Sequence, residues 1–216
     1  MWEYEREALA AGLTPVCGCD EAGAGPLAGR VYAAAVILPL GAGLLGLNDS
    51  KQLTEKKREE LFPLIQERAD AWAVAFVEAA EIDRTDILSA RMKAMQSAID
   101  ALAVKPAFAL IDGNRDKGKH FTIMAPHRCI VKGDSLSASI AAASILAKVS
   151  RDRYMTEMDA VYPGYGFAAH KGYGTKAHYA ALDALGPCPI HRKTFLVKWQ
   201  KKEPAHAGAG DGEELA

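Results

Sequence analysis

The chain has 216 residues, of which 50% are hydrophobic and 25% are charged, and its formal net charge at pH 7 is −1. This composition is typical of a globular protein, and the length allows one domain with a sizeable core. No apolar run approaches the roughly 20 residues that cross a bilayer, and the acidic start lacks the basic residues of a secretory signal. We therefore expect a cytoplasmic protein without a membrane segment.

The predicted elements alternate between strands and helices along the chain. Thr54 is a candidate N-cap for the helix that follows it. From residue 204 onward the sequence is rich in Ala, Gly and acidic residues, which predicts a disordered tail over 204–216. We expect a short helix or a frayed arm over residues 1–12, and helices over 53–69, 81–102 (one or two helices), 135–158 and 177–185. We expect strands over 15–19, 31–38, 71–77 and 107–111, with short strands near 121–124 and 128–131; the Ala, Val and Phe content of 71–77 would also suit a helix. This order predicts an α/β fold in which helices cover a central sheet, with a small helical part at the C-terminus.

Three features of the core are predicted from spacing. Cys17 and Cys19 would share one buried face of a strand as reduced thiols, because the four cysteines form no CxxC pair. Met92 and Met95 are expected to fill the core from one helix face. In the long alanine-rich helix, the expected inner face consists of Leu136, Ile140, Ala143 and Ala147, and a second face of Ser144, Lys148 and Arg151.

The basic residues are concentrated in the second half of the chain. Residues 1–100 carry 10 Lys and Arg against 16 Asp and Glu, whereas residues 101–200 carry 14 against 7. A basic region of this size suits a polyanion such as nucleic acid, although many proteins without such a partner carry similar charge.

An acidic pair at the end of the first predicted strand is the most informative local feature. Asp20 and Glu21 precede a turn that contains Gly23 and Gly25. Carboxylates bind Mg²⁺ or Mn²⁺, and glycines let a ligand approach the main chain, so this corner suits a metal beside a phosphate backbone. A solvated turn is the alternative. Because side chains alternate along a strand, a bend at Glu21 is expected if both acids serve one site.

Two further acids are candidates for the same site. Asp112 ends a predicted strand, and Asp134 precedes the long helix, where it is either a ligand or an N-cap. Four converging carboxylates would repel one another, and a pair of divalent cations relieves such a cluster. Two cations can activate a water and stabilise the leaving oxygen in a phosphoryl displacement.

Taken together in chain order, the motifs between about residues 16 and 195 resemble bacterial ribonuclease HII, a type 2 ribonuclease H. They are DEAG at 20–23, GPLAG at 25–29, DSK at 49–51, DGN at 112–114, KGD at 132–134, SIAAASI at 139–145, HKGYGT at 170–175 and HR at 191–192. The resemblance implies a ribonuclease H-like mixed sheet over residues 1–160 and a helical substrate-binding extension over 161–203. It also implies hydrolysis of RNA paired to DNA and a cut 5′ to a ribonucleotide, even a single one in duplex DNA, that leaves a 3′-hydroxyl and a 5′-phosphate.

The same resemblance assigns roles to individual residues. Asp20, Glu21, Asp112 and Asp134 would bind two Mg²⁺ or Mn²⁺ ions, the turn at Gly23, Ala24 and Gly25 would read the 2′-hydroxyl, and Tyr173 would pack on the sugar. Further substrate contacts are expected from Ser50, Lys51, Ser144, Lys148, Arg151, His170, Lys171 and Lys176. His170 and His191 are expected to have structural or phosphate-side roles rather than to act as general bases.

Two residues depart from the family pattern, and two other functions compete with the proposed one. Ala24 stands where the family usually has Arg, and Arg30 stands where Pro is common; Arg30 is expected to supply charge nearby.

A DNA nuclease of the same superfamily would share the acids without needing to read a 2′-hydroxyl. A binding module for RNA–DNA junctions would keep the groove without turnover. We expect a monomer.

Overall fold

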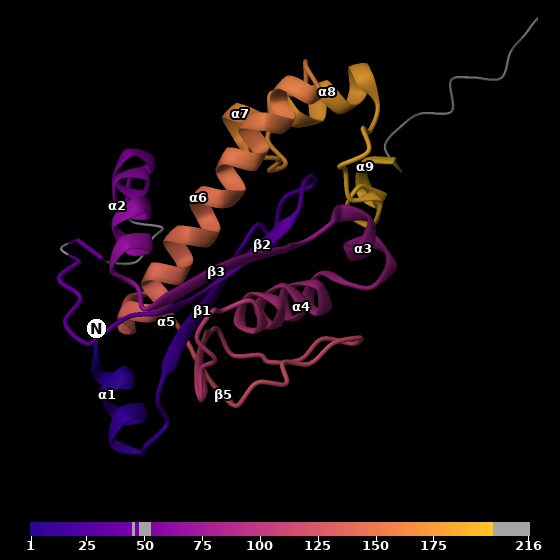
Figure 1. Cartoon of the computed structure of the whole chain (residues 1–216). Helices are drawn as coiled ribbons and strands as arrows, with labels where there is room; N and C mark the ends of the chain where they lie inside the picture. Colours follow the sequence, from indigo (N-terminus) through magenta and orange to yellow (C-terminus); the bar gives the residue numbers. More distant parts are fainter. Residues whose placement is uncertain (45, 48–52, 201–216) are drawn as a thin grey trace, which may run out of the picture.

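The computed structural model describes residues 1–44, 46–47 and 53–200. Within them the strands form one five-stranded sheet of order β3-β2-β1-β4-β5 (Figure 1). Strand β1 pairs antiparallel with β2 and parallel with β4, so the sheet is mixed. The strands are β1 Val16–Ala22, β2 Val31–Ile37, β3 Ala71–Val77, β4 Phe108–Asp112 and β5 His127–Ile130. The predicted α/β architecture, a central mixed sheet with flanking helices, is confirmed.

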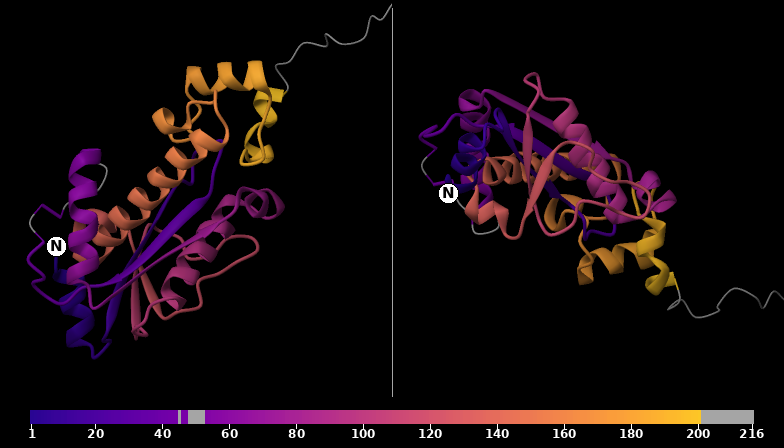
Figure 2. Two further views of the ribbon diagram at one scale, coloured as in Figure 1. Left: turned by 45° about the horizontal axis from the view of Figure 1, so that its top comes forward. Right: turned by 90° about the horizontal axis from the view of Figure 1, so that it is seen from below.

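Helices cover both faces of the sheet (Figures 1 and 2). Helix α4 lies on one face and the long helix α6 on the other, with α2 packed beside α6. Helices α7, α8 and α9 gather at the far end of α6. The helices are α1 Glu3–Ala10, α2 Glu55–Arg68, α3 Ala79–Arg84, α4 Ile87–Asp100, α5 Gly133–Leu136, α6 Ala138–Val161, α7 Phe167–His170, α8 Lys176–Leu185, the 3-10 turn η1 Lys193–Phe195 and α9 Val197–Gln200. No described helix has the length and apolar character needed to cross a membrane.

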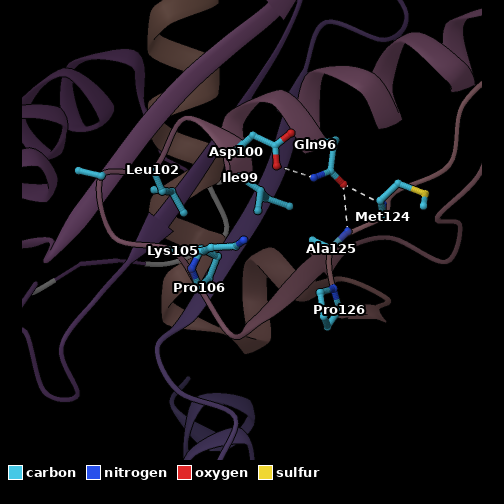
Figure 3. Close-up of a pocket in the computed structure, with 10 residues that line it drawn as sticks. Gln96, Ile99, Asp100, Leu102, Lys105, Pro106, Met124, Ala125 and Pro126 are labelled. Atoms are coloured by element: carbon cyan, nitrogen blue, oxygen red, sulfur yellow. Dashed lines mark hydrogen bonds between the residues drawn. The ribbon is translucent and has the colours of Figure 1, made fainter.

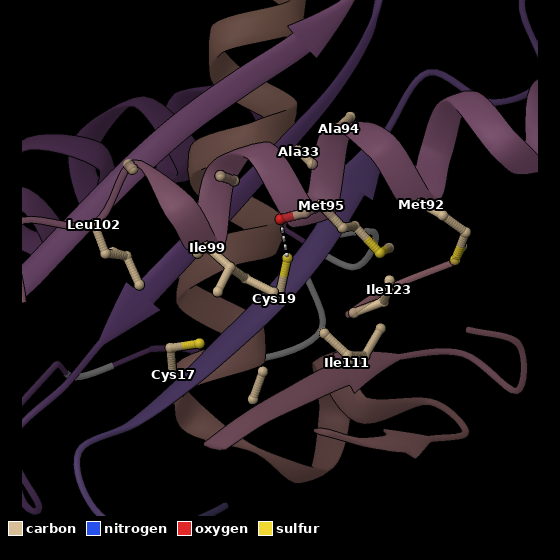
Figure 4. Close-up of a cluster of buried hydrophobic side chains, with 14 of the residues drawn as sticks. Cys17, Cys19, Ala33, Met92, Ala94, Met95, Ile99, Leu102, Ile111 and Ile123 are labelled. Carbon is tan, nitrogen blue, oxygen red and sulfur yellow. Dashed lines mark hydrogen bonds between the residues drawn. The ribbon is translucent and has the colours of Figure 1, made fainter. Parts of the chain in front are cut away.

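The core between β1 and α4 matches the predicted pattern (Figure 4). Cys17 and Cys19 are buried free thiols on the α4 face, as predicted. Met92 and Met95 of α4 belong to the same buried cluster, and the Cys19 thiol lies 3.8 Å from the Met95 carbonyl oxygen. Strand β2 alternates between the two sides, with Ala33 toward α4 and its neighbours toward α6, as the two-residue period of a strand requires.

Helix α6 crosses β1 at very short range. A Cβ atom added to Gly18 would lie 2.1 Å from the backbone carbon of Ser139, so only glycine permits this approach. The expected single helix over 135–158 is wrong at its start, because the chain breaks at Ser137 into α5 and α6. The Ser137 hydroxyl accepts the Ile140 N–H and donates to the buried Glu5 of α1. Leu136 is therefore 43% exposed instead of facing the core.

Other predicted elements agree to within a few residues, with one exception. Thr54 caps α2 through the N–H of Lys57, as predicted. The segment 121–124 is not a strand of the sheet, because Thr122 bridges back to Lys117 within its own loop. The predicted tail at 204–216 lies outside the described residues.

Candidate active site

The acidic pair lies inside β1 rather than after it. Pairing with β2 continues regularly from Asp20 to Ala22, which stands opposite Tyr32. The bend predicted at Glu21 is therefore wrong. The two carboxylates leave opposite faces of the strand: Asp20 bonds the Ser144 hydroxyl of α6, and Glu21 forms an ion pair with Arg91 of α4.

Asp112 joins the pair because β4 ends beside it. The parallel register sets Cys19 next to Ile111, so the residues that follow, Asp20 within β1 and Asp112 at the end of β4, lie on neighbouring strands. Both acids and Glu21 line one pocket of about 260 Å³. The residues that line the pocket are Asp20, Glu21, Ala22, Gly23, Ala24, Gly25, Arg58, Asp112, Ser144, Lys148 and Tyr173. Three of the four predicted acids thus meet, together with the glycines of the predicted turn.

Asp134 lies next to this pocket but does not line it. Its backbone N–H donates to Oδ1 of Asp112 at 3.3 Å, and the residue is 3% exposed. The alternative of a plain N-cap is wrong, since Lys132 occupies the N-cap of α5 and Ser137 that of α6.

The pocket brings buried carboxyl groups close together. Burial and the neighbouring carboxylates of Glu21 and Asp112 raise the pKa of Asp20 well above its ordinary value. Burial likewise raises the pKa of Glu21, although the Arg91 guanidinium opposes this shift. Oε2 of Glu21 is buried without a hydrogen-bond partner. These carboxylates are therefore suited to a cation that would neutralise them.

The described residues hold no group of three His, Cys, Asp or Glu side chains already arranged around a metal ion. The donor set still fits a hard divalent cation, because it consists of carboxylate oxygens at the end of a strand pair and includes an unpartnered one. Asp20, Glu21 and Asp112 are the residues that could hold Mg²⁺ or Mn²⁺.

Two arginines at this site were missed from the sequence. Arg91 is the basic residue one helical turn before the buried Met95, and a charge on that inner face of α4 was the available signal. Arg58 lines the pocket from α2 and donates to the Leu53 carbonyl. On its highly charged helix Arg58 carries no distinguishing pattern.

A turn over residues 23–29, which we call the glycine turn, forms one wall of the pocket. Gly23 has φ +93°, and a Cβ added there would lie 2.0 Å from Nε of Arg151. The Arg151 side chain passes behind the turn, is 1% exposed and donates to the carbonyls of Ala28 and Lys171. Arg151 therefore supports the turn from inside the protein. Its guanidinium is buried and does not face a phosphate of a bound strand, in contrast to the predicted substrate contact.

Tyr173 stands beside the glycine turn with 46% of its surface exposed. Its Cε1 atom would be 3.7 Å from a Cβ built on Gly25, and the Arg151 guanidinium lies 5.8 Å from the ring centre. An aromatic face is thus presented to the pocket next to the backbone of the turn. Its contact with a sugar remains a prediction.

The other predicted contacts are spread around this wall. Ser144 and Lys148 line the pocket, and Lys148 also pairs with Asp152 at 2.8 Å. Lys171 donates to Thr156 at 3.0 Å, and Lys176 begins α8. Ser50 and Lys51 lie outside the described residues.

Neither His170 nor His191 is placed as a general base. His170 bonds the Tyr165 carbonyl through Nε2 and the Gly172 N–H through Nδ1. His191 is 3% exposed and contacts His178.

Arg30, the other departure from the family pattern, pairs with Glu78 at 2.7 Å and lies over Phe76. It does not line the pocket, and the prediction that it supplies charge near the glycine turn stays a prediction.

A larger pocket, of about 550 Å³, lies at the end of α4 (Figure 3). The Gln96 amide bonds Asp100 and the backbone N–H groups of Met124 and Ala125 there. Because these polar groups satisfy one another and a single carboxylate is present, this pocket lacks the chemistry of the smaller one.

A mixed sheet that presents acidic residues at the ends of its central strands, in a pocket open beside a backbone turn, defines a nuclease of the ribonuclease H-like class. The family model for ribonuclease HII matches residues 17–202. Ribonuclease HII from Geobacter sp. (strain M21) is 58% identical over 191 residues, which are 88% of this chain and 81% of that protein. The enzyme of Laribacter hongkongensis (strain HLHK9) is 58% identical over 180 residues, 83% of this chain and 90% of the relative.

Among solved structures, ribonuclease H2 from Pyrococcus horikoshii OT3 matches with a TM-score of 0.69 and 27% identity, covering 83% of this chain and 92% of that chain. The chain belongs to the ribonuclease HII family. It is therefore a ribonuclease H, a hydrolase of a metal-dependent family whose substrates are RNA/DNA hybrids.

Proposed function

We propose that the protein cuts the strand 5′ to a ribonucleotide, including a single one embedded in duplex DNA, and leaves a 3′-hydroxyl and a 5′-phosphate. The observation that supports this most directly is that Asp20, Glu21 and Asp112 line the same pocket as Gly23, Ala24 and Gly25. Groups that can hold metal and groups that can read a sugar are thus within reach of one nucleotide.

We further propose that two Mg²⁺ or Mn²⁺ ions bind at the carboxylates during the reaction. When bound, such a pair supplies an activated water and stabilises the leaving oxygen of a phosphoryl displacement. Asp20 and Asp112 would hold them from two strand ends and Glu21 from the other face of β1. Asp134 fixes Asp112 through its N–H and completes the acidic set.

The glycine turn and Tyr173 would distinguish RNA from DNA. A 2′-hydroxyl is both a donor and an acceptor, and it is the chemical difference between the two sugars at such a site. Backbone N–H groups at Ala24 and Gly25 can donate to it, because the glycines of the turn carry no side chains of their own on the pocket side. The exposed ring of Tyr173 would pack on the same sugar and hold it against the turn.

Lys148, Lys171 and Lys176 would bind phosphates along the strand, which predicts weaker binding at higher salt. We expect a monomer.

The test uses three matched duplexes: one with a single ribonucleotide, one long RNA/DNA hybrid, and one all-DNA control. Each is incubated with Mg²⁺, with Mn²⁺ or with EDTA, and the product ends are mapped. We expect metal-dependent cleavage 5′ to the ribonucleotide and no cleavage of DNA. Cleavage of the all-DNA duplex would favour a DNA nuclease. Tight, metal-independent binding without products would favour a junction-binding module.

A further inference from the structure

Besides Arg151, a buried side chain from the C-terminal segment holds the glycine turn from behind. Arg192 follows α8 in sequence and is 0% exposed. Its guanidinium donates to four carbonyls of the turn: Nη2 to Gly23 at 2.7 Å, Nη1 to Ala24 at 3.0 Å and Pro26 at 2.9 Å, and Nε to Gly29 at 3.0 Å. Arg192 thus lies more than 160 positions from the turn in sequence and satisfies most of the backbone carbonyls that face inward from it.

Main-chain hydrogen bonds fix where this guanidinium stands. The Arg192 N–H donates to the Leu27 carbonyl at 2.8 Å, and the Gly29 N–H donates to the Ile190 carbonyl at 2.8 Å. Between them, Ala28 and His191 form an antiparallel bridge. The turn and the C-terminal segment are therefore joined through their main chains, and the arginine lies at this junction.

The hydrogen bonds to Arg192 determine on which side of the turn the backbone N–H groups lie. In a trans peptide the C=O and the following N–H point in opposite directions. When Arg192 draws the carbonyls of Gly23 and Ala24 inward, the N–H groups of Ala24 and Gly25 are turned to the opposite side. Ala24 and Gly25 line the acidic pocket, and Arg192 does not.

A lysine at position 192 could not make the same set of hydrogen bonds. A guanidinium presents five donors in a rigid planar fork, and Arg192 uses three of its nitrogen atoms toward four acceptors. An ammonium group has three donors at one point on a flexible chain, so it would leave carbonyls of the turn unpartnered.

We propose that Arg192 is a positioning residue for ribose recognition, which aims the N–H groups of Ala24 and Gly25 into the active-site pocket. The inference rests on the proposed function, in which these amides read the 2′-hydroxyl. It adds a residue of the C-terminal segment to the determinants of substrate choice, although that residue touches no substrate.

The experiment compares wild type with Arg192→Lys and Arg192→Gln, and with Arg153→Lys as the matched control. Arg153 makes a surface ion pair with Glu59, away from the turn. Binding of a duplex with one ribonucleotide and of the same all-DNA duplex is measured by fluorescence anisotropy in Ca²⁺, and melting temperatures are recorded in parallel. The key quantity is the ratio of the two dissociation constants.

We expect both Arg192 variants to fold and to lose about tenfold of this preference, the effect of one misaligned hydrogen bond. Binding of the all-DNA duplex should change little, and Arg153→Lys should keep the full preference. A folded Arg192 variant with unchanged preference, or the failure of both variants to fold, would overturn the inference. If the wild-type protein showed no preference for the duplex with a ribonucleotide, this result would instead contradict the proposed function on which the inference rests.

Discussion

The imidazole rings of His178 and His191 share one hydrogen bond, with their Nε2 atoms 3.0 Å apart. The Cys188 N–H donates to Nδ1 of His191 at 2.9 Å, so the proton of His191 is on Nε2 and donates to His178. His178 then carries its own proton on Nδ1, which lies 3.0 Å from the Tyr173 carbonyl. Both rings are neutral, and they hold the backbone of Tyr173 beside the pocket.

This pair predicts loss of stability in acid. Burial and the adjacent His178 lower the pKa of His191 from 6.5 to about 4, and burial also lowers the pKa of His178. Between these values the unfolded chain binds more protons than the folded one. Stability from this source is therefore complete above pH 6.5 and falls as the pH decreases toward 4. Thermal melts of wild type across this range should show the decline.

The variant His191→Gln tests the origin of that decline. It removes one titrating ring, so its stability should depend less steeply on pH over the same range, after a loss of about 1 kcal/mol at neutral pH from the altered hydrogen bond. The exposed His120 offers a control, since His120→Gln should leave the wild-type slope intact. Equal slopes in all three proteins would show that other groups cause the acid sensitivity.

Asp112→Asn should preserve substrate binding and abolish most turnover. The amide keeps the size of the side chain and can still accept the Asp134 N–H, but it withdraws a charge from the acidic pocket. We expect single-turnover cleavage to fall by on the order of 100-fold or more, with anisotropy reporting similar affinity for a hybrid. Asp70→Asn changes an exposed carboxylate and should be inert. Undiminished cleavage by Asp112→Asn would exclude Asp112 from the metal ligands.

The sequence was sufficient to predict the acids and the core but not the arginines. Asp20 and Asp112 could be predicted because each ends a short apolar run, and neighbouring strand ends meet in a sheet of this class. Arg91 carried a signal in its charge on the inner face of α4, but nothing in the sequence indicated its partner, Glu21, which lies far away along the chain. Arg192 belongs to the HR motif at 191–192, but its role could not be predicted, because its partners are backbone carbonyls with no residue signature. The break at Ser137 was missed because its cause, the buried Glu5, comes from α1.

Tyr173→Ala should impair cleavage at a single embedded ribonucleotide more than cleavage of a long hybrid. A lone ribonucleotide offers one sugar to the ring, whereas a long hybrid offers many registers in which other contacts compensate. We expect a loss of about tenfold, or ~1.4 kcal/mol, on the single-ribonucleotide duplex. Tyr173→Phe keeps the ring and should retain most activity. Equal losses on both substrates would contradict a role at the junction sugar.

Arg91→Met should make the fold depend on metal. Removing the guanidinium leaves Glu21 buried without its ion-pair partner, which should lower the free energy of unfolding in EDTA by about 2 kcal/mol. A divalent cation would then neutralise Glu21 without competition from Arg91, so Mn²⁺ should raise the melting temperature more than in wild type. Arg128→Met, which removes an exposed ion pair with Glu7, is the control. An identical Mn²⁺ response in both variants would show that Arg91 does not compete for this site.

Ala24→Arg should tighten binding to a duplex that contains a ribonucleotide. Ala24 lines the pocket and is partly exposed, so a longer side chain can extend toward a phosphate of the bound strand. One added phosphate contact should contribute about 1 kcal/mol, or fivefold in affinity. It should also steepen the dependence of log affinity on log salt by about 0.9. Ala24→Gln provides length without charge and should leave that slope unchanged. If Ala24→Arg binds with wild-type affinity and slope, the turn acts through its backbone alone, and the loss of the family arginine has no cost in this protein.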